Sequence, residues 1–167
     1  MRKILVLLPI LALAACAPKA RVEPAVMVEA FYAHLLTYPV TGAPNAGDIP
    51  RIAPFLSESL LADLQRAARL RDSAVAQHPD EKPPFAEGDL FTSLFEGPTS
   101  FSVQATQDRP GTAVLVHFEH REGASSVEWV DTVYVVRRDT TWAVTDVAYG
   151  GTWPMANKGT LRANLRP

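Results

Sequence analysis

The spacing of apolar residues changes along this chain, and the later part of the pattern places the strongest limit on the fold. From Thr99 to about residue 148, apolar and polar residues alternate in four stretches that short turn-like segments separate. Alternation with a period of two is typical of strands that bury one face, and connections this short join antiparallel neighbours. The sequence therefore predicts a four-stranded antiparallel meander with a cover on one face.

The four strands are predicted from their alternating residues. In chain order these residues are Phe101, Val103 and Ala105, then Val114, Val116 and Phe118, then Trp129, Asp131, Val133 and Val135, and finally Trp142, Val144 and Asp146. Val130, Tyr134 and Val136 fall on the other face of the third strand. Turns are expected at "RPG" (109–111), "REGAS" (121–125) and "RRDTT" (137–141).

Helical segments before the strands can supply the cover. Pro24 suits the first turn of a helix over 24–38, and Ser57 is expected to cap a second helix over 58–77. A short turn is expected at 49–53 and a short helix at 157–164. The predicted fold class is therefore α+β, with N-terminal helices packed on a curved, cone-like four-stranded antiparallel sheet, in a single domain over 24–167.

The N-terminal residues have the layout of an export signal. Arg2 and Lys3 precede an apolar stretch at 4–13, which is too short to span a bilayer as a stable helix. Leu13-Ala14-Ala15-Cys16 resembles the lipobox of bacterial lipoproteins and contains the only cysteine. We expect a signal peptide over 1–15, lipidation at Cys16 and a tether over 16–23. An ordinary cleaved signal, with Cys16 incidental, is the alternative.

The net charge of the exported chain limits its partners. Loss of Arg2 and Lys3 leaves 14 basic residues against 18 acidic residues, a net charge of −4. This charge argues against nucleic acid and against an anionic lipid surface as the main partner. Ala17 follows the cysteine, and by resemblance to sorted lipoproteins the expected destination is the outer membrane, facing the periplasm.

An irregular segment at 78–100 is the first candidate for binding. It contains four prolines, five acidic residues and three phenylalanines, so it is neither a helix nor a strand throughout. A loop this long is usually functional or disordered, and its aromatic residues argue against disorder. Its candidate partner-binding residues are Glu87, Asp89, Phe91, Phe95 and Glu96. The acids could also form a paired acid/base site, but solvated loop charges or caps are the favoured alternative.

The C-terminal segment is the second candidate. Gly150 and Gly151 precede apolar residues without periodicity, and aromatic, Met and Arg residues are enriched in interface cores. Trp153, Met155 and Arg162 are therefore candidate partner-binding residues. A tail that packs against the sheet is an equal alternative.

Catalytic and metal chemistry have little support in the sequence. His117 and His120 have three-residue spacing on a strand and point to opposite faces, so no metal site is expected, and no cofactor motif is present. Trp129, Trp142 and Asp146 could line a pocket on the concave side of the sheet. The alternative is that the tryptophans are core and Asp146 bonds to a nearby amide.

Several segments together resemble a bacterial family of envelope lipoproteins of unknown function with a nuclear-transport-factor-two-like (cystatin-like) fold. These segments are "VEAFYAHLL", "IAPFLSESLLADL", "GDLFTSLFEGPTSFSV", "TTWAVTDVAYGG" and "KGTLRANL". The resemblance implies no catalytic residues, and Asp89, Glu96, Trp142 and Asp146 match only as motif positions. It implies an accessory role at an envelope or export-channel complex.

The expected function is therefore that of a non-enzymatic, lipid-anchored module that binds another envelope protein. Its binding surface would be the 83–98 loop, the C-terminal tail, or both. An immunity protein that neutralises a toxin is the first alternative, because an acidic loop suits a basic toxin. A small-ligand or catalytic pocket is the second.

Overall fold

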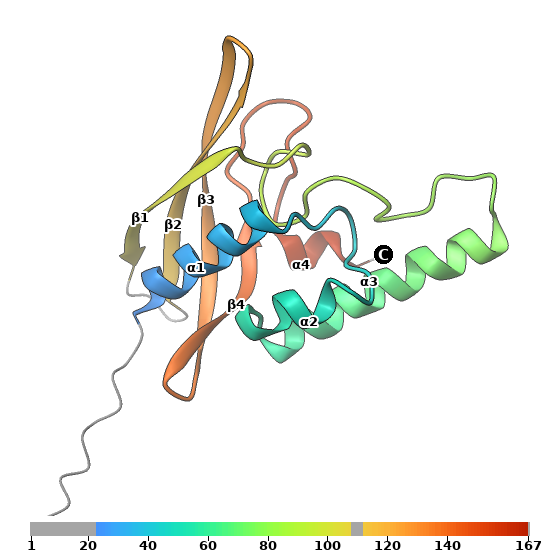
Figure 1. The fold of residues 1–167 in the computed structure, drawn as a ribbon, viewed down its shortest axis with the longest axis horizontal. Helices are drawn as coiled ribbons and strands as arrows, with labels where there is room; N and C mark the ends of the chain where they lie inside the picture. Colours follow the sequence, from blue (N-terminus) through green and yellow to red (C-terminus); the bar gives the residue numbers. More distant parts are fainter. Residues whose placement is uncertain (1–22, 108–111, 167) are drawn as a thin grey trace, which may run out of the picture.

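The computed structural model describes residues 23–107 and 112–166. The signal peptide, the lipidated Cys16, most of the tether and the "RPG" turn lie outside these residues. Within them the chain forms one four-stranded antiparallel sheet, with the strands in sequential order, together with helices that precede and follow it. Figure 1 shows α1 crossing the sheet while α3 extends away from it. The predicted α+β class is confirmed.

The helices begin and end close to their predicted bounds. α1 (Pro24–Thr37) has Pro24 in its first turn and buries Met27, Val28, Phe31 and Tyr32. α2 (Ile49–Ile52) and η1 (Ala53–Phe55) form the expected short turn. α3 (Glu58–Gln77) starts at the predicted cap, where the Ser57 hydroxyl accepts from the amide of Leu60 at 3.2 Å.

The strands confirm the predicted meander. They are β1 (Ser100–Gln107), β2 (Ala113–Glu122), β3 (Ser125–Arg138) and β4 (Thr141–Ala148). On β3, Trp129, Asp131, Val133 and Val135 are buried, while Val130, Tyr134 and Val136 are exposed as expected. The register places Phe118 opposite both Phe101 and Trp129, so aromatic side chains share the inner face with α1.

The free edge of β4 is covered by two other parts of the chain. The Ser57 amide donates to the carbonyl of Val144 at 2.8 Å, and the Tyr149 amide donates to the carbonyl of Gly159 at 3.0 Å. These contacts occupy backbone groups that would otherwise be available for pairing with another chain.

The last helix is shorter than predicted. α4 (Leu161–Asn164) starts at the Thr160 cap, whose hydroxyl accepts from the amide of Ala163 at 3.3 Å. The helix does not extend back to residue 157 because Gly159 has a positive φ of 73° and Thr160 pairs with Ala148. Leu161 is nevertheless fully buried, so α4 closes the core.

Candidate functional site

A groove of about 400 Å³ lies between the C-terminal end of α1 and the irregular segment that follows α3. This volume is in the range of small binding pockets. Leu35, Leu36 and Phe95 are among its apolar lining residues, and three carboxylates, from residues 87, 89 and 96, lie among them. None of the lining residues is Lys, Arg or His. The groove is therefore an apolar hollow with an acidic lining.

One wall of the groove is the stretch of residues 88–97, called the 88–97 loop below. Side chains from distant segments donate to its backbone carbonyls. The Tyr32 hydroxyl donates to the carbonyl of Phe91 at 3.0 Å, and the Tyr149 hydroxyl donates to that of Leu90 at 2.6 Å. The Asn157 side-chain amide donates to the carbonyls of Asp89 and Thr92 at 3.1 and 2.8 Å.

Backbone donors bond to three further carbonyls of the loop. The amides of Asn157, Gly97 and Asp89 donate to the carbonyls of Ser93, Leu94 and Phe95, at 2.8, 3.0 and 2.7 Å respectively. Every carbonyl from residue 89 to residue 95 therefore accepts a hydrogen bond. Buried backbone groups that lose such partners cost free energy, so the loop is held in one conformation without regular secondary structure.

A fully buried carboxylate fixes the loop to the sheet. Asp131 accepts from the amide of Ser93 at 2.8 Å, the amide of Gly150 at 2.8 Å and the Trp129 indole at 3.0 Å. The Ser93 hydroxyl is a further donor. Burial raises the pKa of Asp131, and these hydrogen bonds oppose the shift. The carboxylate connects the 88–97 loop, β3 and the segment after β4.

Gly150 is required by this arrangement. A Cβ at position 150 would lie 2.0 Å from the carbonyl oxygen of Val130, closer than atoms can approach. Its amide can therefore reach Asp131 only because the residue has no side chain.

Asp89 lies in the groove wall and caps the start of the loop. Its carboxylate accepts from the Phe91 amide and the Thr92 hydroxyl, each at 2.7 Å. Burial raises the pKa of Asp89 to about 6, against the effect of these hydrogen bonds, and the nearby Asp131 carboxylate adds to the increase. At neutral pH the group is mainly ionised.

This pKa predicts a pH dependence of stability. Between about pH 4 and pH 6 the folded protein holds more protons at Asp89 than the unfolded chain does, because the folded pKa is the higher one. The free energy of unfolding therefore contains an Asp89 contribution that decreases as pH rises through this window, by on the order of 1–3 kcal/mol. Asp89→Asn should remove that slope, because the amide does not titrate. The variant should still fold, because Asn can accept from the Phe91 amide and donate to the Thr92 hydroxyl.

The measurement is urea unfolding of wild type and Asp89→Asn at several values of pH. Asp131 also has a raised pKa, and Asp63 has a lowered one, so the quantity to compare is the difference between the two proteins. Parallel curves across pH 4 to 7 would show that Asp89 has an ordinary pKa.

The aromatic side chain of Phe95 is 47% exposed at the mouth of the groove. Its ring lies against Gly88, where a Cβ would be 2.4 Å from two ring carbons and where φ is 85°. Gly88 therefore allows the ring to pack directly on the backbone. The result is an exposed aromatic side chain whose position is restricted.

The five candidates in the irregular segment have different environments. Glu87 and Glu96 are exposed, and Glu87 forms an ion pair with Lys82. Asp89 is partly buried and acts as a turn cap, in line with the favoured alternative. Phe91 is only 1% exposed and packs edge-on against Phe31, with ring centroids 5.5 Å apart. The prediction that Phe91 contacts a partner is wrong, because the ring belongs to the core.

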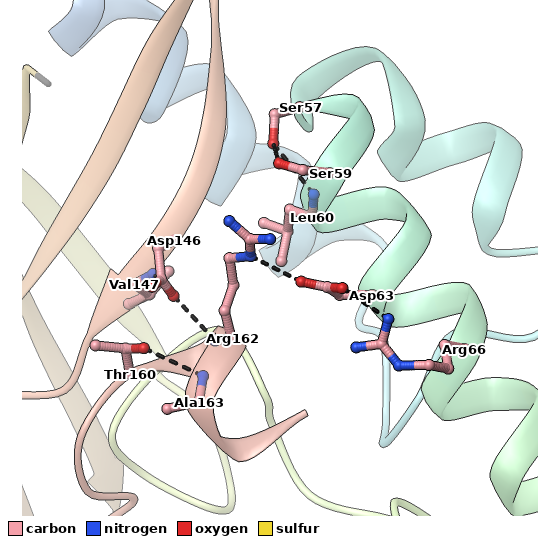
Figure 2. A network of polar contacts seen from close by, with 10 residues as sticks. All are labelled: Ser57, Ser59, Leu60, Asp63, Arg66, Asp146, Val147, Thr160, Arg162 and Ala163. Carbon is pink, nitrogen blue, oxygen red and sulfur yellow. Dashed lines mark hydrogen bonds and ion pairs between the residues drawn. The ribbon is translucent and has the colours of Figure 1, made fainter. Parts of the chain in front are cut away.

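Of the three C-terminal candidates, one is exposed and two are engaged within the protein. Met155 is 85% exposed, whereas Trp153 packs edge-on against Trp129 with ring centroids 5.7 Å apart. Arg162 is not free for a partner, because its guanidinium forms an ion pair with Asp63 at 2.7 Å. Figure 2 shows Arg162 between α3 and β4, with Asp63 also bonded to Arg66. Trp153 and Arg162 therefore pack against the rest of the fold, as the alternative of a tail that closes the sheet predicts.

Trp129, Trp142 and Asp146 do not form a common pocket. Trp142 pairs with Arg137 on β3, eight positions from Trp129, which corresponds to about 26 Å along a strand. Asp146 accepts from the backbone amides of Arg162 and Val147 at 3.0 and 2.9 Å. The alternative that Asp146 bonds to a nearby amide is therefore correct. The predicted grouping of the three residues in one pocket is wrong, because the strand register separates the two tryptophans.

The two strand histidines bind different partners. His117 contacts Glu128 at 3.2 Å, and His120 contacts the carbonyl of Gly97 at 2.6 Å. Within residues 23–107 and 112–166, no cluster of three or more potential ligands is arranged to hold a metal ion.

The residues that organise the site were not among the predicted candidates. Tyr32, Asp131, Tyr149 and Asn157 hold the loop, although none was a candidate. Only Asp131 had a recognisable signal, namely a carboxylate at an apolar position of the alternating third strand. The other three form pairs with residues 59 to 68 positions away, which a local pattern does not reveal.

No family model matches the sequence, and no curated protein matches it either. None of the described helices is long and apolar enough to cross a membrane.

Proposed function

We propose that this chain is a lipoprotein, anchored at Cys16 to the outer membrane and facing the periplasm, whose folded part is a non-enzymatic module that binds another envelope protein. The binding surface is the mouth of the groove. It is formed by Phe95, Glu87 and Glu96, with Leu36 on the opposite wall. The lipobox and the Ala17 that follows its cysteine support the location, and the 88–97 loop supports the binding role.

The observation that carries the proposal is a rigid irregular loop with an exposed aromatic residue. Loops that are held rigid and expose aromatic anchors bind well because little conformational entropy is lost on association. Here the hydrogen bonds to seven consecutive carbonyls hold the backbone, and Phe95 is 47% exposed. The same network also holds Phe91 in the core, so the feature that points to binding is the exposed Phe95 ring on a fixed backbone.

Photo-crosslinking in cells tests this proposal. We expect the lipidated chain with benzoylphenylalanine at position 95 to give a discrete crosslinked product with one envelope protein. The matched control has the same group at Val136, which is 46% exposed but lies on the outer face of the sheet. The same products at both positions, or none at position 95, would contradict the proposal.

The identity of the crosslinked protein separates the two versions of this role. A component of an export channel or envelope complex would indicate an accessory protein. A toxin that is captured only when competitor cells are present would indicate an immunity protein, for which the acidic lining of the groove is the supporting observation.

A further inference from the structure

The charges around the groove are not balanced by the protein itself. Glu87 has Lys82 as an ion-pair partner, but no basic side chain of the described residues forms an ion pair with Asp89 or Glu96. Asp89 is held by an amide and a hydroxyl, which are neutral donors and leave part of its acceptor capacity unused. A cation that enters the groove would meet three carboxylates, of which only Glu87 already has a basic partner among the described residues.

The apolar surface continues beyond the hollow. Leu36 and Phe95 line the groove and are also 38% and 47% exposed. A small cation in the hollow would leave these two side chains in water, whereas a chain that crosses the groove would cover them. The shape therefore favours a polypeptide with apolar residues next to its charged one.

We propose that the groove binds an arginine side chain of the partner polypeptide, with the apolar residues beside that arginine packed against Phe95 and Leu36. This inference rests on the proposed function and adds the chemistry of the element that is recognised. Arginine fits better than lysine because its planar guanidinium can bond to more than one carboxylate and can stack on the Phe95 ring.

The test uses short synthetic peptides and the lipidated chain in detergent micelles, so it does not require the partner. The probe is a blocked pentapeptide, Gly-Leu-Arg-Leu-Gly, and the matched control peptide has citrulline, which is neutral and nearly the same shape, in place of arginine. Amide chemical shifts of the labelled protein report both the affinity and the location of binding. We expect the arginine peptide to shift residues of the 88–97 loop and the citrulline peptide to bind about tenfold more weakly or not at all.

Variants of the protein complete the test. Glu87→Gln combined with Glu96→Gln should weaken the arginine peptide about tenfold, whereas Glu58→Gln combined with Glu122→Gln, which removes two exposed acids elsewhere, should leave it unchanged. Raising NaCl from about 50 mM to about 500 mM should weaken binding in the wild type.

Three results would overturn the inference: equal binding of the citrulline peptide, absence of any shift in the loop, or binding of ethylguanidinium alone as tight as that of the peptide. The last would indicate a site for a small cation. Failure here is distinguishable from failure of the proposed function. If crosslinking at position 95 persists in the Glu87→Gln/Glu96→Gln protein, the interface exists but does not recognise a cation.

Discussion

Replacing Asp131 by Ala lowers the free energy of unfolding by about 3–5 kcal/mol, or prevents folding altogether. The side chain is fully buried and accepts from Ser93, Trp129 and Gly150. Removal of the carboxylate leaves the buried N–H donors of Ser93 and Trp129 without an acceptor, and each unsatisfied buried donor costs roughly 1–3 kcal/mol. The measurement is urea unfolding followed by tryptophan fluorescence and by far-UV circular dichroism.

Two further variants serve as controls for Asp131→Ala. Asp80→Ala removes an exposed carboxylate of the irregular segment and should change stability by less than about 0.5 kcal/mol. Asp131→Asn keeps the shape but places an amide among groups that donate, so we expect an intermediate loss. An Asp131→Ala protein as stable as wild type would show that the loop does not depend on this carboxylate.

The same substitution should reduce stability far more at Phe91 than at Phe95. Phe91→Ser should cost about 3–5 kcal/mol of unfolding free energy, because it leaves a cavity among Phe31 and its neighbours and buries a hydroxyl. Phe95→Ser should cost less than about 1 kcal/mol, because the ring is half exposed. Denaturant unfolding measures both losses.

Phe95, unlike Phe91, should affect partner binding without affecting folding. The Phe95→Ser protein should remain folded and lose its partner, which co-purification with the crosslinked protein identified above would measure. Val136→Ser is the matched control, because Val136 has nearly the same exposure on the other side of the sheet. Retention of the partner by Phe95→Ser would remove Phe95 from the interface.

The strands and helices could be predicted because their signals are local. Alternation on β3 correctly separated the buried Val133 from the exposed Tyr134, and the Ser57 cap correctly marked the start of α3. Each of these features depends on residues within a few positions of one another. The short α4 was predicted too long because its start depends on Thr160 pairing with Ala148.

The site could be predicted only in part, because the irregular segment has no period. Without a period, Phe91 and Phe95 look equivalent, although one is in the core and the other is exposed. The acids at 87, 89 and 96 were recognised as candidates, and the structure brings them to one groove. The opposite wall comes from α1 and the residues after it, and nothing in the segment itself indicates that neighbour.

The hydrogen bonds that hold the 88–97 loop also determine which positions of the site can be substituted without changing the path of the backbone. Its path is set by hydrogen bonds from Tyr32, Tyr149 and Asn157, which are outside the loop and bond only to its backbone. The exposed side chains at 87, 95 and 96 take no part in those bonds. Substitutions at these three positions can therefore alter what is recognised while the path of the chain stays the same. The fold thus resembles a fixed frame that can carry different recognition surfaces, which makes these positions suitable for diversification in a binding library.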